Sequence, residues 1–495
     1  MAQHRADLVA AEDVLLFVNA AVTATGQREF HSGAREQQLS LDFLHEYVRV
    51  NYRRVYAAVL ALDINDHNAA LIVRRLLETA GEAGAADKRV EGRLIAARLA
   101  ALPPQRVYRL FRALRAAKVN NRRTRAIMRD WLADRPDLAF DAVKYRGGLK
   151  SAVRHTHLSC AQDELGDFLF RPMRRSDRFR HAQLEAYRQA RFSQAAVYDL
   201  PFSVAEGFAA RHGIAREKFL EGIAPRMTRL ERLRTQRTGQ RTDLTGMPLT
   251  RLALYVLSLG PAERVDRRAE LTGALRSAAR RAAGPHAGSW GRVAAVLDDS
   301  YSSSGSGVKR RRPLAVALAC HFLLDALAAP GSYTPLWTSG GADPLLVRPW
   351  GATPLGERII DALEHGPQRL VIVSDGWDNA PPGLAGEVLR IWRTRLDPDR
   401  RTSVVHLNPV YDADGFDVRR LAASVPTAGI RDAEDLPALV EIAQFSEGRT
   451  GAAELYAYLD RRTEDYVDGR TAKGATKNTA EKAAKDTPID TEEAR

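Results

Sequence analysis

The sequence predicts a multidomain chain in which an all-helical repeat region precedes a parallel α/β domain. Three observations support this prediction. Apolar residues recur with helical spacing from the N-terminus to about residue 283, and the following segment AGPHAGSWG (283–291) has the composition of a linker. From residue 292 onward, β-rich runs alternate with helical stretches. A chain of 495 residues is also too long for a single hydrophobic core.

In the helical region, 1–283, one face of each predicted helix is apolar. Val107, Leu110, Phe111 and Leu114 follow the spacing i, i+3, i+4, i+7, and arginines occupy the positions between them. Similar units recur at 41–60, 68–81, 91–101, 122–134, 204–220 and 247–260. This pattern predicts stacked antiparallel helix pairs of the HEAT or armadillo type.

The α/β domain is expected over 284–461, and a disordered tail over 462–495. The β-rich runs lie at 292–297, 333–338, 370–374 and 402–408, and the helical stretches at 312–328, 354–364, 384–396 and 433–445. This alternation predicts a doubly wound, Rossmann-like parallel sheet. The tail is charged and polar and offers almost nothing to bury, which is typical of disorder.

Composition limits the classes of partner and compartment. The formal net charge of +13 and the pI near 9.8 favour polyanionic partners such as nucleic acid. Two cysteines, Cys160 and Cys320, form neither a disulfide framework nor a structural zinc site, which fits a reducing cytoplasm. No apolar run has the length of a transmembrane helix, and the acidic N-terminus is unlike a signal peptide. We therefore expect a cytoplasmic protein without a membrane partner.

Oxygen-bearing side chains follow two of the predicted strands and one turn. They are Asp298, Ser300 and Ser302 after the apolar run 293–297, Thr353 in a Gly-Ala-Thr-Pro turn, and Asp375 after the run 370–373. Ligand sites of open α/β sheets lie at the carboxyl ends of strands. Two carboxylates and three hydroxyls suit a hard cation such as Mg²⁺, and these segments offer no sulfur or imidazole for zinc.

This set resembles the metal-ion-dependent adhesion site (MIDAS) of von Willebrand factor A (vWA) domains, with DxSxS, Thr and Asp-Gly in the expected order. The resemblance implies that Ser300 and Ser302 bind the metal directly and Thr353 directly or through water. It also implies that Asp298 and Asp375 act mostly through water, which leaves one position for a partner's carboxylate.

A basic run marks the helical region. Between Gly92 and Arg129 there is no acidic residue. The basic residues in this span are Arg93, Arg98, Arg106, Arg109, Arg112, Arg115, Lys118, Arg122, Arg123, Arg125 and Arg129. One interpretation is a surface that follows phosphates; the other is a solvated basic face with acids supplied by neighbouring helices. A second cluster, at 226–241, favours nucleic acid.

Two segments of the helical region look like the TROVE module of the Ro autoantigen family. They are 125–158, with a tryptophan-bearing helix, Lys-Tyr-Arg and Thr-His-Leu, and 245–259, with a Met-Pro-Leu-Thr helix start. Members of that family fuse a ring of helical repeats to a C-terminal vWA domain. The resemblance implies binding of small noncoding RNAs, such as Y RNAs, and of single-stranded RNA ends of misfolded RNAs.

The resemblance also implies RNA contacts from Lys144, Arg146 and His157. Together with five arginines of the basic run, the expected RNA-binding residues are Lys144, Arg146, His157, Arg109, Arg112, Arg115, Arg122 and Arg123.

No known catalytic motif is present: the sequence lacks a P-loop, GxSxG, a dinucleotide fingerprint and HExxH. We therefore predict a nonenzymatic, RNA-binding ribonucleoprotein component whose vWA-like domain recruits a protein partner through Mg²⁺. The alternative is an adaptor that binds a protein such as an AAA+ ATPase without RNA. A metal-dependent nuclease is a third class.

Overall fold

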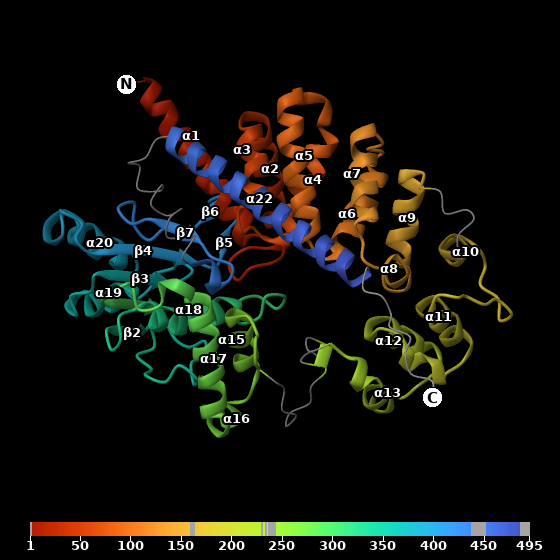
Figure 1. Cartoon of the computed structure of the whole chain (residues 1–495). Helices are drawn as coiled ribbons and strands as arrows, with labels where there is room; N and C mark the ends of the chain where they lie inside the picture. Colours follow the sequence, from red (N-terminus) through yellow and green to blue (C-terminus); the bar gives the residue numbers. More distant parts are fainter. Residues whose placement is uncertain are drawn as a thin grey trace. The chain divides into compact units, whose positions relative to one another are not determined.

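The computed structural model describes residues 2–158, 164–228, 231–232, 235, 244–436 and 452–485. The chain divides into two compact units (Figure 1). Residues 70–243 form the first, called here the helical unit. Residues 1–69 and 244–495 form the second, called here the α/β unit.

The helical unit consists of short helices and 3₁₀ turns. These elements are α4 (Asp66–Glu78, which begins just before the unit), η2 (Ala80–Glu82), α5 (Ala85–Ala101), α6 (Pro104–Ala116), α7 (Arg122–Ala133), α8 (Leu138–Lys144), α9 (Arg146–Thr156), α10 (Glu164–Phe170), α11 (Ala182–Phe192), η3 (Ala195–Asp199), α12 (Phe202–Arg211), α13 (Arg216–Ile223) and η4 (Ala224–Arg226).

Aromatic side chains hold α6, α7 and α9 together. The ring of Trp131 meets Tyr108 and Phe111 edge to face, with centroids 5.2 and 5.4 Å away, and its indole N–H donates to the Leu99 carbonyl at 3.1 Å. Gly148 of α9 sits against Tyr108, and a Cβ at this position would lie 2.6 Å from the tyrosine Cβ. The apolar face predicted for α6 is therefore the packed face.

Helices make up most of the α/β unit. They are α1 (Ala2–Thr23), α2 (Ala34–Asn51), α3 (Arg53–Ala58), η1 (Val59–Ala61), α15 (Leu249–Ser258), α16 (Pro261–Asp266), α17 (Arg268–Ala283), η5 (Gly284–His286), η6 (Tyr301–Ser304), α18 (Arg312–Leu327), α19 (Leu355–Glu364), α20 (Leu384–Ile391), η7 (a π-helical turn, Trp392–Leu396), η8 (Ala433–Asp435) and α22 (Ala452–Lys485). The strands are β1 (Val293–Leu297), β2 (Tyr333–Trp337), β3 (Arg369–Val373), β4 (Ser403–Asn408), β5 (Tyr411–Asp412), β6 (Asp417–Val418) and β7 (Thr427–Gly429).

Five strands form a parallel sheet in the order β2-β1-β3-β4-β7, and β5 pairs antiparallel with β6. The four predicted strands are present, and the parallel α/β prediction is confirmed. The sequence did not predict β7, because a three-residue strand is too short to show a period.

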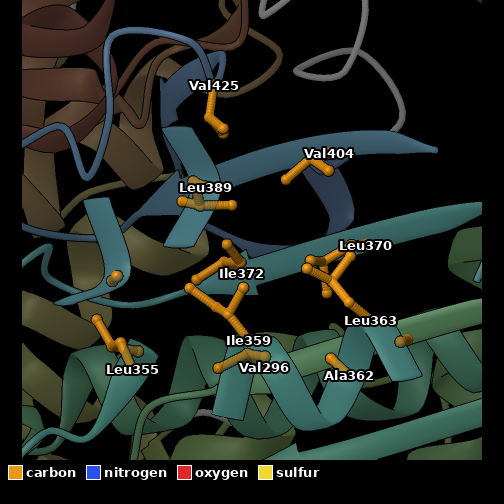
Figure 2. Close-up of a cluster of buried hydrophobic side chains, with 12 residues drawn as sticks. Val296, Leu355, Ile359, Ala362, Leu363, Leu370, Ile372, Leu389, Val404 and Val425 are labelled. Atoms are coloured by element: carbon orange, nitrogen blue, oxygen red, sulfur yellow. The ribbon is translucent and has the colours of Figure 1, made fainter. Parts of the chain in front are cut away.

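Buried apolar side chains from β1, β3 and β4 pack against α19 and α20 on one face of the sheet (Figure 2). Ala294 and Val296 of β1 belong to this cluster. Because side chains alternate along a strand, the other β1 residues point to the opposite face, and α18 packs against β1 as well. Burial on both faces explains why β1 and β3 read as continuous apolar runs.

The first helices belong with the sheet rather than with the helical unit. The Asn19 side chain of α1 donates to Asp417 Oδ1 at 2.8 Å and accepts from the Gly429 N–H at 2.9 Å. The Thr250 hydroxyl of α15 donates to Glu434 at 2.8 Å. The unit boundaries at 69/70 and 243/244 therefore differ from the expected boundary at 283/284. Helical periodicity identifies a helix but not the core in which it packs.

Some predicted helices are divided or extended. The predicted 41–60 helix is interrupted at Tyr52, where φ is −137° and ψ 48°, and the 204–220 helix at Gly213, where φ is +66°. The region predicted to be a disordered tail is instead helical through Lys485, since α22 continues across it. Leu459 and Val467 of α22 are buried, and α22 packs against α1 and α3. Residues 437–451, which include most of the predicted helix at 433–445, and residues 486–495 lie outside the described residues.

Within the part of the chain that the structure describes, no helix has both the length and the apolar character to cross a membrane.

Candidate metal centre and basic helical face

The predicted metal ligands lie on loops at the carboxyl ends of β1 and β3, which are neighbouring strands. Leu297 of β1 is in register with Val373 of β3, and the Asp298 N–H donates to the Val373 carbonyl at 3.0 Å. The third loop is tied to both others. The Tyr301 N–H donates to the Gly351 carbonyl at 3.1 Å, and the Thr353 N–H donates to Asn379 Oδ1 at 2.8 Å.

Two hydroxyls of the DxSxS segment converge. Ser300 Oγ lies 3.2 Å from Ser302 Oγ, and Asp298 Oδ1 accepts the Ser300 N–H at 2.9 Å. Mg²⁺–oxygen bonds are about 2.1 Å long, so two neighbouring ligands of an octahedral ion lie about 3.0 Å apart. The two hydroxyls therefore stand at a separation that one such ion can bridge.

The neighbouring Asp299 has a different environment. Its carboxylate accepts hydrogen bonds from the Thr338 hydroxyl at 2.8 Å, the Ser339 N–H at 2.8 Å and the Ser339 hydroxyl at 2.6 Å. These hydrogen bonds stabilise the buried carboxylate and join the β1 loop to the loop after β2. Asp299 is a structural residue beside the centre.

Asp375 has a buried oxygen without a hydrogen bond. Its side chain is only 2% exposed. Oδ1 accepts the Trp377 N–H at 3.0 Å, whereas Oδ2 accepts no hydrogen bond among the described residues. The next residue, Gly376, has φ +79°, and a Cβ there would lie 2.7 Å from the Arg419 carbonyl oxygen, so this turn requires glycine.

The two carboxylates of the centre repel each other. Burial, together with the charge of Asp375, raises the pKa of Asp298 to about 7, while hydrogen bonds from Ser300 oppose the rise. A divalent cation between these groups would favour both charged forms. The buried oxygen of Asp375, the paired hydroxyls and the two carboxylates together fit a hard cation held by Ser300, Ser302, Thr353, Asp298 and Asp375.

No cluster of three or more His, Cys, Asp or Glu side chains suited to a metal occurs among the described residues. A cation at this centre would therefore depend on hydroxyl ligands.

The structure adds His31 to this site, from the loop between α1 and α2. Its Nε2 lies 3.5 Å from Asp375 Oδ2, and its ring stacks on Trp377 with centroids 4.4 Å apart. The contact of His31 with this site could not be predicted from the sequence, because His31 precedes the other site residues by more than 260 positions in the chain. No local spacing signals such a contact.

Part of the basic run lies on one face of α6. Arg109, Arg112 and Arg115 are exposed at intervals of three residues, and Arg122, at the start of α7, is exposed as well. Within the described part of the chain, the side chains of these four arginines make one polar contact, a long one of 3.4 Å from Arg115 to the Ser151 hydroxyl. These arginines are therefore accessible to a polyanion.

Other members of the basic run are engaged inside the unit. Arg123 pairs with the nearly buried Glu91 at 3.1 Å and donates to the Lys88 carbonyl at 3.0 Å. Arg129 donates twice to the Thr156 carbonyl at the end of α9, at 2.9 and 3.0 Å. Arg123 therefore has an acidic partner on a neighbouring helix, as expected if this part of the basic run is a charged face balanced by other helices.

The three residues implied by the TROVE resemblance have different surroundings. Arg146 donates to the Phe168 carbonyl at 2.7 Å and stacks on the Phe168 ring. Lys144 is half-buried and lies 5.5 Å from the centroid of Phe140. His157 is exposed and ends α9 with a left-handed φ of 53°. Arg146 therefore has a structural role of its own, while His157 is free to contact a ligand.

Along α9, two further cations continue the row that begins at Arg146. Lys150 and Arg154 follow it at intervals of four, and both lie over the ring of Phe170, 5.5 and 5.2 Å from its centroid. The Phe170 side chain is 37% exposed. Burial and the charges of Arg154 and Arg146 lower the pKa of Lys150. The spacing of Arg146, Lys150 and Arg154 is present in the sequence, but these residues lie outside the acid-free span between Gly92 and Arg129.

Most of the second basic cluster, 226–241, lies outside the described residues. Within its described part, Arg226 pairs with Asp199 at 3.0 Å.

No family model matches the chain, and the curated proteins include none that is similar to it.

Proposed function

We propose that this chain is a nonenzymatic RNA-binding protein with a TROVE-like helical-repeat ring and a vWA-like α/β domain. RNA is held on the basic face of α6 and α9, and the α/β unit carries a Mg²⁺ centre for recruiting a protein partner. The RNAs are small noncoding RNAs of the Y type and single-stranded ends of misfolded RNAs, as the TROVE resemblance implies.

The observation that carries the proposal is the accessible row Arg109, Arg112 and Arg115. Exposed guanidinium groups that lack acidic partners interact favourably with phosphates and release counterions on binding. Nearby in the fold, since α6 packs against α9, the partly exposed ring of Phe170 lies beside Lys150 and Arg154. Aromatic rings flanked by cations stack with unpaired bases, which is how single-stranded RNA is commonly bound.

In the metal centre, Ser300, Ser302 and Thr353 would supply hydroxyl ligands, and Asp298 and Asp375 the negative charge. A bound divalent ion would add a positive site to which a partner's carboxylate can bind. These five side chains would position that ion and neutralise its charge.

Charge reversal tests the RNA proposal. Full-length protein with Arg109, Arg112 and Arg115 changed to Glu is compared with a matched variant that has Arg211, Arg216 and Lys218 changed to Glu. Both changes alter the net charge equally. Affinity for a single-stranded RNA and for a small structured RNA is measured across a range of salt concentrations.

We expect the α6 variant to bind both RNAs more weakly and to lower the slope of log K against log salt by about 2, since each lost phosphate contact contributes about 0.7. The matched variant should retain the parental slope. If both variants lose affinity equally, binding reflects net charge alone and the assigned face is wrong.

The second candidate is an adaptor that binds an acidic protein partner without RNA. The buried Oδ2 of Asp375, which accepts no hydrogen bond among the described residues, favours it, because this oxygen is a candidate cation ligand independent of the basic face. Parental protein that binds neither RNA at low salt, yet binds an acidic partner only when Mg²⁺ is present, would establish this candidate instead.

A further inference from the structure

The loop between α1 and α2 borders the candidate metal centre. Three consecutive side chains of this loop contact residues in or near the centre. Glu29 pairs with Lys309, Phe30 meets the ring of Tyr301 with centroids 5.9 Å apart, and His31 reaches Asp375. Tyr301 is the middle residue between the two serine ligands. The loop therefore borders the DxSxS segment on one side and Asp375 on the other.

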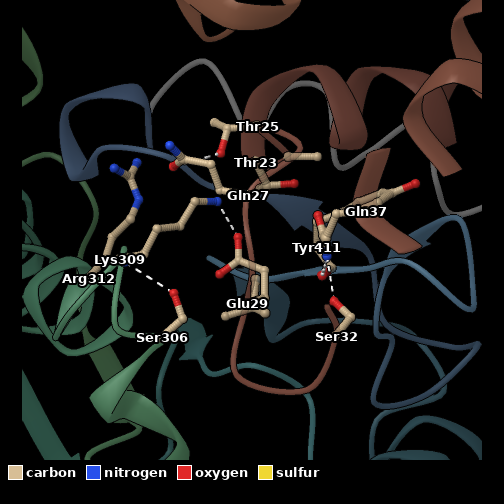
Figure 3. A network of polar contacts seen from close by, with 12 residues as sticks. Thr23, Thr25, Gln27, Glu29, Ser32, Gln37, Ser306, Lys309, Arg312 and Tyr411 are labelled. Carbon is tan, nitrogen blue, oxygen red and sulfur yellow. Dashed lines mark hydrogen bonds and ion pairs between the residues drawn. The ribbon is translucent and has the colours of Figure 1, made fainter. Parts of the chain in front are cut away.

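The loop is firmly anchored. The Glu29 and Lys309 side chains are 4% and 9% exposed, and Figure 3 shows the lysine reaching across to the glutamate. On the other side, Gln37 donates to the Ser32 hydroxyl at 2.6 Å and to the Tyr411 carbonyl at 3.0 Å. A buried ion pair and a buried amide thus fix the backbone on both sides of His31.

The imidazole of His31 is oriented toward Asp375. Its ring stacks on Trp377, and Arg419 covers the Trp377 ring 3.8 Å from its centroid. Nε2 stands 3.5 Å from the carboxylate oxygen that accepts no hydrogen bond. This separation is close to the distance of about 3.0 Å between neighbouring ligands of one six-coordinate ion, and close to the 3.2 Å between the two serine hydroxyls.

We propose that His31 is a ligand of the metal centre, contributed by the N-terminal segment to a site otherwise built from the α/β sheet. This inference rests on the metal centre proposed above and changes its chemistry. An imidazole nitrogen binds Mn²⁺, Co²⁺ and other transition metals better than Mg²⁺, which prefers oxygen. The centre therefore selects a transition metal over Mg²⁺ when both are present.

The test uses full-length protein freed of metal by a chelator. Binding of Mg²⁺, Mn²⁺ and Co²⁺ is measured by titration calorimetry, and the visible absorption of the Co²⁺ form reports on nitrogen ligation. The variants are His31→Ala, His31→Gln, Ser300→Ala and, as a matched loss of an exposed imidazole, His286→Ala. Phe30→Ala perturbs the loop while keeping the imidazole.

We expect His31→Ala and His31→Gln to lower Mn²⁺ and Co²⁺ affinity about 10-fold or more and to change the Co²⁺ spectrum, with a smaller loss for Mg²⁺. His286→Ala and Phe30→Ala should retain the parental spectrum. Agreement between the two His31 variants separates ligation from a folding defect, and the far-ultraviolet circular dichroism of each metal-free variant checks this directly.

Two outcomes overturn different claims. If Ser300→Ala abolishes metal binding but both His31 variants keep parental Co²⁺ affinity and spectrum, the centre exists and His31 is not its ligand. If Ser300→Ala binds all three ions like the parent, the centre itself lies elsewhere and the assignment of His31 fails with it.

Discussion

Asp141 in the helical unit and Asp375 in the α/β unit are buried carboxylates with opposite surroundings. Asp141, in the helical unit, is fully buried and accepts one hydrogen bond from Tyr108 and two from Arg135, at 2.6 to 3.0 Å. Asp375, in the α/β unit, is also buried, but one of its oxygens accepts no hydrogen bond. A buried charge is costly unless it is paired. The difference indicates a structural role for Asp141 and supports the proposed ligand role of Asp375.

The two units also differ in where these arginines lie. In the helical unit, Arg109 and Arg112 are exposed, whereas Arg135 is used internally. In the α/β unit, Arg264 is buried and donates to the Leu345 and Val347 carbonyls. The helical unit thus has exposed arginines at its surface. The α/β unit has the buried carboxyl groups of Asp298 and Asp375 at the end of its sheet.

The largest expected effect concerns the paired carboxylate. Asp141→Ala should lower the free energy of unfolding of the helical unit by about 3–5 kcal/mol, because Arg135 and the Tyr108 hydroxyl lose their partner. Hydrogen exchange of peptides covering 104–156, with urea unfolding, measures the loss. Asp130→Ala, an exposed acid of α7, should change stability by about 0.5 kcal/mol or less. Equal effects of the two variants would remove the structural role of the Asp141 network.

A pH effect is expected in the α/β unit. Burial, with a smaller contribution from Arg276, lowers the pKa of His321 from its ordinary 6.5 to about 4. The unfolded chain therefore binds a proton that the folded chain does not, and stability present above pH 6.5 is lost as the pH falls toward 4. One pKa unit corresponds to about 1.4 kcal/mol, so the loss approaches about 3 kcal/mol.

Urea unfolding of the α/β unit between pH 7 and pH 4 measures this effect. His321→Phe should reduce the slope without abolishing it, because burial also lowers the pKa of His406 to about 4. The variant loses the hydrogen bond between His321 and the Tyr333 hydroxyl and is therefore less stable at pH 7. His286→Ala, which removes an exposed imidazole, should leave the profile as it is. An unchanged slope in His321→Phe would mean that another group titrates.

Binding of metal should distinguish the two units most directly. Mg²⁺ at 100 times its Kd should stabilise the α/β unit by about 2.7 kcal/mol, because it binds only the folded state. Thermal unfolding with peptide-resolved hydrogen exchange should place the gain in residues 244–436 and leave 70–158 unchanged. Ser300→Ala should abolish the gain. A gain that persists in this variant would contradict the assigned ligands.

Much of the α/β unit could be predicted from the sequence because its signals are local. Each strand is a short apolar run, and Asp298 and Asp375 directly follow β1 and β3. Since neighbouring parallel strands end at one edge of a sheet, the order of the segments alone predicts that these residues converge.

Other parts depend on contacts between distant segments. Nothing in the periodicity of α1 indicates that Asn19 joins β6 to β7, or that the following loop places His31 on Asp375. On the helical side, the spacing identified Arg109, Arg112 and Arg115 as one face. It could not separate Arg122, which is exposed, from Arg123, which pairs with Glu91. The reason is that the acidic partner of Arg123 lies on another helix, and the spacing within one helix gives no information about it.

The smallest expected effect is also the sharpest test of the contrast between the two buried acids. In metal-free protein, Asp375→Asn should raise the free energy of unfolding by about 1 kcal/mol, because it removes one of two repelling buried charges. The amide retains the acceptor for the Trp377 N–H. The same variant should gain nothing from Mg²⁺. Urea unfolding at neutral pH, with and without a chelator, measures both effects.

The matched control is the neighbouring Asp299→Asn, since Asp299 is also buried at this strand end but accepts hydrogen bonds from Thr338 and Ser339. Its amide cannot accept them all, so this variant should be less stable than the parent by about 1–3 kcal/mol. Opposite signs for Asp375→Asn and Asp299→Asn follow only if Oδ2 of Asp375 accepts no hydrogen bond until a cation binds. If Asp375→Asn were destabilising as well, its carboxylate would serve the fold, as Asp141 does.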